Sequence, residues 1–236
     1  MPSITWTPPA VASELIRLRR RLWRAVESQH IASTTRLVAT AAEQDVLELI
    51  LEASKPAVPA EAARLHYLLA TPFRYPSPFG SRFRAPTEPG VWYGAEVVRS
   101  ACAELGYWRW RFLTDSEGLS TLGPSPQTVF QASIDTRAVD LTRAPFSRDQ
   151  AHWGHRSDYG PTQAFAAIAR ETTAGAIRYA SVRDPEHAAA VAVLRPDAFK
   201  PLRPLQQSTW FLTLKPERVI WRREGESFEF DAADWK

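Results

Sequence analysis

The sequence is poor in cysteine and in long apolar runs, and each shortage excludes a class of protein. The 236 residues include one cysteine, Cys102, so no internal disulfide can form, as expected in a reducing cytoplasm. No apolar run approaches the roughly 20 residues that span a bilayer. The first residues, MPSITWTPPA, lack the basic and then apolar pattern of a secretory signal. We therefore expect a cytoplasmic protein.

The sequence motifs of several common enzyme classes are also missing. There is no GxGxxG, no GxxxxGK[ST] and no GxSxG, the motifs of dinucleotide-binding folds, P-loops and hydrolase elbows. His152 and His155 are three residues apart, but Gly154 separates them and no acidic or cysteine residue stands at ligand spacing. We predict a pair of loop histidines and no metal. Cys102 is predicted to be a buried packing residue rather than a nucleophile.

Lysine is scarce, whereas arginine is abundant. The chain has 29 basic residues, four of them lysine, against 26 acidic ones, and its net charge is +3. Arginine binds phosphate through paired hydrogen bonds, so a nucleotide or nucleic acid is a conceivable ligand. The cluster RLRRRLWR at 17–24 has apolar residues at helical spacing, which predicts an amphipathic helix over 12–29 with a basic outer face. A non-enzymatic module that binds nucleic acid through this helix is the alternative function, although no zinc-finger or RNP-type motif accompanies it.

The order of the predicted elements indicates an α+β protein. A second helix is predicted over 40–54, with Thr40 as N-cap and Glu43 as its capping-box partner. From about residue 66 the chain is proline-rich, aromatic and strand-like, until a helix at 96–112. Further strands are predicted at 129–135, 137–142, 176–182, 188–194, 208–214 and 218–223, and a further helix at 162–173, capped by Thr162. We divide the chain into an N-terminal helical extension, 1–60, and one strand-rich domain, 61–236, packed as one globular unit.

One carboxylate on the helix at 96–112 has an unusual position. At about 100° per residue, an apolar stripe forms on one side of this helix: Val97, Ala101, Leu105, Trp108 and Phe112. Glu104 falls at the edge of that stripe. A carboxylate half-sunk among apolar side chains lowers stability unless something compensates, so Glu104 is a candidate functional residue.

Glu104 belongs to a set of four candidate residues. Arg82 follows a turn in GSRF, Tyr93 comes eleven residues later, Glu104 eleven residues after that, and Ser181 lies in a predicted strand. Each has an ordinary structural explanation: a surface ion pair for Arg82, a core aromatic for Tyr93, a strand-end hydroxyl for Ser181 and an ion pair with a nearby arginine for Glu104. The residues alone leave the choice between these explanations and a shared site open.

Two stretches of the sequence contain an ordered set of short motifs. They read FRYPSPFGSRFRAPTEPGVWYGAEVVRSACAE and DYGPTQAFAAIARETTAGAIRYASVRDP. The set resembles the pattern of the RES-domain family, the toxins of bacterial toxin–antitoxin pairs: a Gly-Gly-Arg-aromatic turn, a strand ending in Tyr, a helix with Ala-x-x-Glu, a Thr-Gln helix and a Tyr-x-Ser strand. Arg82, Tyr93, Glu104 and Ser181 match the family's arginine, tyrosine, glutamate and serine. The likeness runs from about residue 68 to residue 194, which makes 61–236 a predicted RES domain.

The sequence departs from the family pattern at two positions in the turn. The second glycine is replaced by Ser81, and Arg84 stands where asparagine is more usual. Both changes leave the shape of the turn open, while every charged or hydroxyl position of the pattern is kept.

The resemblance implies a fold like that of ADP-ribosyltransferase toxins, with a mixed or antiparallel sheet, and an activity that consumes NAD as substrate. Glu104 is then expected to stabilise the positive charge that develops when the nicotinamide–ribose bond breaks. Arg82 suits the pyrophosphate. Tyr93 offers a flat face to the nicotinamide or ribose, and the Ser181 hydroxyl is expected to hold that ribose or the amide.

Further ligand contacts and a partner follow from the same resemblance. Arg74 and Tyr75, in PFRYP, are expected to add nucleotide contacts. The expected partner is a small antitoxin with a helix-turn-helix DNA-binding region, which covers the active-site cleft, so that DNA is contacted through the antitoxin. The acceptor of the ADP-ribosyl group stays open between water, phosphate and a protein side chain, for example on a nucleotide-synthesis enzyme.

Overall fold

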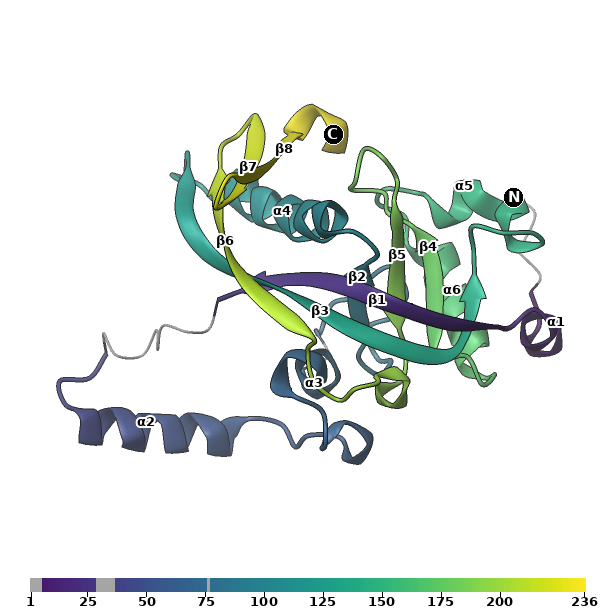
Figure 1. The fold of residues 1–236 in the computed structure, drawn as a ribbon, viewed down its shortest axis with the longest axis horizontal. Coiled ribbons are helices and arrows are strands. Elements are labelled where there is room, and N and C mark those ends of the chain that lie inside the picture. Colours follow the sequence, from purple (N-terminus) through teal and green to yellow (C-terminus); the bar gives the residue numbers. More distant parts are fainter. Residues whose placement is uncertain (1–5, 29–36, 76) are drawn as a thin grey trace.

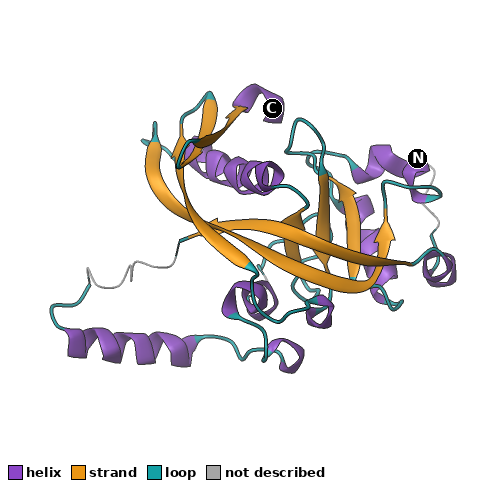
Figure 2. Cartoon of the chain, in the orientation of Figure 1, coloured by secondary structure: helices purple, strands orange, loops and turns teal. Residues whose placement is uncertain are grey.

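The computed structural model describes residues 6–28, 37–75 and 77–236. A mixed eight-stranded sheet carries helices on both sides (Figures 1 and 2). The strands are β1 (Ile16–Glu27), β2 (Trp92–Ala95), β3 (Leu122–Asp140), β4 (Ala176–Ala180), β5 (Ala189–Val193), β6 (Gln206–Leu214), β7 (Arg218–Arg223) and β8 (Glu226–Asp231). The α-helices are α1 (Pro8–Ser13), α2 (Ala41–Ser54), α3 (Tyr67–Arg74), α4 (Val98–Asp115), α5 (Gln150–Trp153) and α6 (Gly160–Arg170). The predicted α+β class is confirmed.

Five strands close into a ring through the long strand β3. The order in the sheet is β1-β2-β5-β4-β3-β6-β7-β8, and β1 also pairs with β3. One edge of β3 pairs with β1 in antiparallel register, from Ile16↔Ala138 to Glu27↔Gln127. The other edge pairs with β6 along its first half and, in parallel, with β4 at its end. The ring therefore consists of β1, β2, β5, β4 and β3, and β6, β7 and β8 extend from it (Figure 1).

Strand β1 corrects the predicted helix over 12–29, of which residue 29 lies outside the described residues. Leu18 and Leu22 are buried, whereas Arg17, Arg19 and Arg21 are exposed. Two leucines four residues apart share a face in a helix and in a strand, so their spacing did not distinguish the two structures. Pairing with β3 along the whole strand decides in favour of the strand. The basic helix on which the nucleic-acid alternative was based is therefore not formed.

Several other predicted elements are confirmed in place and differ in their ends. Helix α2 has Thr40 as N-cap, whose hydroxyl accepts the N–H of Glu43 at 3.2 Å, as predicted. Helix α6 begins at Gly160, so the prediction that Thr162 caps it is wrong; the Thr162 hydroxyl donates to the carbonyl of Tyr159 at 3.0 Å. The predicted strands at 129–135 and 137–142 are parts of the single strand β3. The predicted division at residue 60 stays a prediction, although β1 shares its sheet with the later strands.

The prediction of strand-like structure from residue 66 is wrong for its first part, which forms α3. This helix buries Leu68, Leu69 and Phe73 in an apolar cluster with β1, β3 and β5. Pro72 lies inside the helix, where it removes one backbone donor. Because burial of the apolar face outweighs that loss, the proline did not end the helix. Helices α3 and α4 lie on opposite sides of the sheet (Figure 1).

Helix α4 packs on the sheet through a face that shares only Ala101 with the predicted stripe. Its buried residues are Ser100, Ala101, Cys102, Ala103, Gly106, Tyr107, Trp110 and Leu113. A Cβ on Gly106 would lie 3.1 Å from the Val219 side chain, so a small residue allows this close approach to β7. The stripe residues Val97, Trp108 and Phe112 are instead 43%, 53% and 55% exposed. No helix of the described residues is long and apolar enough to cross a membrane.

Candidate active site

Arg82 lies on a tight turn between α3 and β2. The backbones of Ser81 and Arg84 exchange two hydrogen bonds, of 2.8 and 3.2 Å. The hydroxyls of Ser81 and Tyr93 are 2.8 Å apart and hydrogen-bonded, and the Tyr93 hydroxyl also accepts the N–H of Phe83 at 3.0 Å. The buried Arg84 guanidinium donates to five backbone carbonyls of the surrounding loop. The two departures from the family pattern, Ser81 and Arg84, thus supply hydrogen bonds that hold the turn.

The Arg82 guanidinium is held from two sides. Its Nη1 donates to the carbonyls of Trp153 and His155, at 3.0 and 2.9 Å. Its guanidinium carbon lies 4.7 Å from the centre of the Tyr159 ring. Because these bonds occupy Nη1 alone among the described residues, Nε and Nη2 keep their donors for a ligand.

Glu104 and Ser181 are joined by a short hydrogen bond. The Ser181 hydroxyl donates to Glu104 Oε1 at 2.6 Å and accepts the N–H groups of Arg183 and Asp184, at 3.3 and 3.2 Å. Burial raises the pKa of the Glu104 carboxyl, while the Ser181 hydrogen bond and the charges of Arg82 and Arg183 act in the opposite direction. Ser181 is fully buried, so it contacts the site through Glu104.

The loop after β4 is fixed to α4 by the buried Asp184. Its carboxylate contacts the Ser100 hydroxyl and the Arg99 guanidinium, both at the start of α4. Arg99 also pairs with Glu186 at 2.8 Å. Because α4 carries Glu104 and the loop directly after β4 carries Ser181, these contacts fix the two segments that the hydrogen bond joins.

Arg183 is held by the C-terminal segment of the chain. The Trp235 indole N–H, in the terminal 3-10 helix η5 (Ala232–Trp235), donates to the Arg183 carbonyl at 2.7 Å. The Arg183 guanidinium carbon lies 3.5 Å from the centre of the Tyr107 ring, and its Nη2 donates to the Tyr159 hydroxyl at 3.3 Å. The side chain is therefore buried as an ordered cation.

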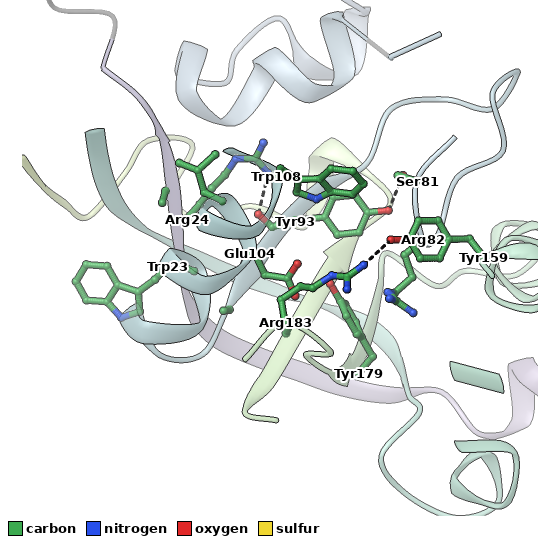
Figure 3. A pocket seen from close by; sticks show the side chains of 16 residues that line it. Trp23, Arg24, Ser81, Arg82, Tyr93, Glu104, Trp108, Tyr159, Tyr179 and Arg183 are labelled. Atoms are coloured by element: carbon green, nitrogen blue, oxygen red, sulfur yellow. Dashed lines mark hydrogen bonds between the residues drawn. The ribbon is translucent and has the colours of Figure 1, made fainter. Parts of the chain in front are cut away.

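These side chains surround a cavity of about 210 Å³ (Figure 3). Its charged lining consists of two guanidinium groups and one carboxylate, those of Arg82, Arg183 and Glu104. Arg24 also borders the cavity, but its guanidinium lies over Trp92. Its aromatic lining consists of Trp23, Tyr93, Trp108, Tyr159 and Tyr179. The two guanidinium groups suit an anionic ligand such as a pyrophosphate diester, and the flat rings suit a nucleoside.

Residues 58–215 match the RES domain. The chain belongs to the RES-domain family. Among solved structures it is similar to a chain in the crystal structure of the M. tuberculosis MbcT–MbcA toxin–antitoxin complex, with a TM-score of 0.49, 13% identity, and coverage of 86% of this chain and 87% of that chain. A search of curated proteins finds no significant match.

The RES match does not include Arg24, a cavity residue that the sequence reasoning missed. On β1, its Nη1 donates to the Tyr93 carbonyl at 2.8 Å, and its guanidinium lies over Trp92. Its Nε is buried and has no hydrogen-bond partner among the described residues. Burial lowers the pKa of Arg24 to about 10, so the side chain stays charged at neutral pH. With the segment taken as a strand, Arg24 falls on the same face as Leu22, which is the signal that could have found it.

Two other predicted residues of this RES protein lie elsewhere. Arg74 donates to the Pro56 carbonyl at 2.7 Å and to Glu52 at 3.0 Å, and its guanidinium lies over the ring of Tyr75. Neither Arg74 nor Tyr75 lines the cavity. The structure brings together Arg82, Tyr93, Glu104 and Ser181, and it places this Arg–Tyr pair beside α2.

The histidine pair takes different positions in the RES fold. His152 lies in α5, whereas His155 follows it in a loop and accepts the N–H of Asp158 at 2.8 Å through Nδ1. The described residues contain no group of three or more histidine, cysteine or acidic side chains that could hold a metal. Cys102 is buried as predicted, and burial raises the pKa of its thiol.

Proposed function

We propose that this RES protein is the toxin of a bacterial toxin–antitoxin pair and cleaves the nicotinamide–ribose bond of NAD in the cytoplasm. The observation that supports this most is the Glu104 carboxylate, bonded to Ser181 at 2.6 Å and lining a cavity with the guanidinium groups of Arg82 and Arg183. A carboxylate at a partly dehydrated position interacts strongly with a positive charge that forms beside it.

In the proposed reaction, the bond between the nicotinamide nitrogen and ribose C1′ breaks and its electron pair goes to the nitrogen. Nicotinamide leaves as a neutral molecule, and positive charge moves onto the ribose, as in glycoside hydrolysis. Glu104 stabilises that charge. The acceptor then forms a bond to C1′ and loses a proton, which completes the transfer.

The remaining side chains bind and orient the substrate. The guanidinium groups of Arg82 and Arg183 bind the pyrophosphate, because their two positive charges match its two negative charges. The Tyr93 ring faces the nicotinamide end. Ser181 is a positioning residue, because its hydroxyl donates to Glu104 and orients the carboxylate.

The fate of the ADP-ribosyl group and the partner belong to the same proposal. Release to water or phosphate depletes NAD, and transfer to a protein, such as a nucleotide-synthesis enzyme, modifies that target. The partner is an antitoxin with a helix-turn-helix region, through which the pair contacts DNA. Radiolabelled NAD in cell extract separates the two fates: label in one protein band indicates transfer, and label in small molecules alone indicates depletion.

Nicotinamide release from NAD by the purified protein tests the proposed activity. Glu104→Gln keeps the size of the side chain and removes its charge, so we expect release to fall by about 10²–10³-fold. Glu27→Gln is the matched control, because Glu27 is exposed and pairs with Arg109 outside the cavity lining. Equal rates for wild type and Glu104→Gln would overturn the proposal, as would growth arrest on expression that Glu104→Ala does not relieve.

A further inference from the structure

An exposed tryptophan at the cavity has no part in the reaction described above. Trp108 lies on α4 one turn after Glu104, its side chain is 53% exposed, and it lines the same cavity (Figure 3). Leaving a large aromatic ring in water is unfavourable, and exposed apolar surface beside a cavity marks a binding surface. The position of Trp108 therefore needs a ligand-related explanation.

The cavity is too small to enclose a whole dinucleotide. Its volume is about 210 Å³, below the roughly 300–1,000 Å³ of pockets that enclose drug-sized ligands. In the proposed function, the nicotinamide riboside and the pyrophosphate already fill the part lined by Glu104 and the arginines. The second nucleoside must then lie at the exposed side of the cavity, where Trp108 is the exposed aromatic residue.

The neighbours of Trp108 hold its indole in a defined orientation. Tyr107 meets it edge to face, with ring centres 5.1 Å apart and planes at 71°. The same Tyr107 ring carries the Arg183 guanidinium 3.5 Å from its centre. Tyr107 thus holds the Arg183 cation, which suits a phosphate, and the adjacent Trp108 offers a ring that suits a base. A nucleotide requires both groups side by side.

We propose that Trp108 is the stacking platform for the purine base at the far end of the dinucleotide. The proposal rests on the proposed function, because it takes a nicotinamide dinucleotide as the ligand. Since Glu104 and Trp108 are four residues apart on one helix, α4 fixes the reacting end and the base end at a constant separation. The stack makes the site select a dinucleotide over the mononucleotide that lacks the purine half.

Phe112 provides a matched control for Trp108. It lies one turn further along the same stripe of α4 and is 55% exposed, but it does not line the cavity. Both side chains are exposed, so neither alanine variant removes core packing. Unchanged thermal melting of Trp108→Ala and Phe112→Ala checks this.

Titration calorimetry with AMP tests the platform without any need for catalysis. Alanine substitution of a stacking aromatic commonly weakens base binding by tenfold or more, so we expect Trp108→Ala to raise the Kd of AMP by about tenfold. Trp108→Phe should keep most of the affinity, and Phe112→Ala should match wild type. The same Kd in Trp108→Ala and wild type, or no saturable AMP binding by wild type, would overturn the platform.

Kinetics with two substrates complete the test. For NAD, Trp108→Ala should raise KM and leave kcat unchanged, whereas the kinetics of nicotinamide mononucleotide should not change. An equal loss with both substrates would contradict a role at the purine end. If wild type binds AMP through Trp108 and yet releases no nicotinamide, the proposed function fails and the platform stands. If wild type releases nicotinamide but neither the Kd of AMP nor the KM of NAD depends on Trp108, the platform fails and the proposed function stands.

Discussion

The segment that matches the RES domain and the segments that flank it contribute differently to the site. Residues 58–215 supply Glu104, the Ser181 hydroxyl that orients it, and Arg82. The flanking segments supply Arg24 on β1, and Trp235, whose indole holds the Arg183 backbone. The Glu104 carboxylate and its hydrogen bond are thus internal to the family domain, while part of the support comes from outside it.

The difference follows from the sheet. β1 pairs with β3 along its whole length and so brings Arg24 to the backbone of the cavity residue Tyr93. The C-terminal residues return over α4, where Trp235 packs against Tyr107 with ring centres 5.7 Å apart. Variants inside the matched segment should therefore alter the chemical step, and variants in the flanking segments should alter substrate binding.

After Glu104→Gln, the largest effect is expected from another change inside the matched segment, Ser181→Ala. Loss of the hydrogen bond to Glu104 should lower kcat by about 10–100-fold, since the carboxylate is then oriented less well. The bond also favours the ionised carboxyl, so its loss should move the acid limb of the kcat profile to higher pH. A pH–rate profile of nicotinamide release measures both, and an unshifted limb would contradict the positioning role.

A smaller effect is expected from Arg24→Gln on β1. Arg24 holds the backbone of the cavity residue Tyr93, so loss of this hydrogen bond should raise KM for NAD by about tenfold and change kcat little. Arg21→Gln on the same strand is the control, because Arg21 is exposed and does not line the cavity. A fall in kcat alone would remove the distinction between the two parts of the site.

A severalfold effect is expected from Trp235→Phe in the C-terminal segment. This change keeps an aromatic ring and removes the N–H that donates to the Arg183 carbonyl, so KM for NAD should rise. Trp110→Phe is the matched control, because Trp110 lies in the same apolar cluster as Trp235 and its indole N–H donates to the Pro216 carbonyl at 2.9 Å. Both variants should melt at similarly lowered temperatures, by a few degrees for a loss of about 1 kcal/mol. Equal KM values for the two would show that Trp235 acts through general stability.

The smallest effect is expected on stability, from Glu104→Gln. Burial raises the pKa of the Glu104 carboxyl in the folded state. At a pH between the pKa of this carboxyl in the unfolded chain and its pKa in the folded chain, the carboxyl is therefore ionised mainly in the unfolded chain. The folded state is therefore penalised as pH rises through this range, and the variant should melt higher than wild type at neutral pH. Below the unfolded pKa the difference should shrink. Melting curves against pH measure this, and a variant that melts lower at neutral pH would contradict the burial of a charged carboxyl.

The sequence predicted those parts of the fold whose signals are local. The Thr40 cap and the alternating strand at 176–182 depend on neighbouring residues, and the structure has both elements in place. The strand at 16–27 could not be predicted in this way, because its leucine spacing also fits a helix and the pairing with β3 joins residues more than a hundred positions apart. Arg24 was missed for the same reason.

The candidate site shows the same limit. The family motifs pointed to Arg82, Tyr93, Glu104 and Ser181, and the structure brings these residues together. This was possible because the order of the motifs along the chain follows the order of the elements that carry them. Periodicity placed an apolar stripe on one side of α4, but Gly106 and its small neighbours let another face pack against the sheet. Periodicity gives the faces of a helix; the residues opposite decide which face is buried.

The identity of the products formed from NAD tests the central claim most directly. Mass spectrometry of a reaction with wild-type protein should detect free nicotinamide, with the adenosine diphosphate part of the substrate intact, and Glu104→Gln should leave NAD unchanged over the same time. Nicotinamide mononucleotide and AMP as products would mean that the pyrophosphate is cleaved instead, and intact NAD with wild type would mean that the cavity does not act on the glycosidic bond. Either result would contradict the assignment of Glu104 as the group that stabilises the ribosyl cation.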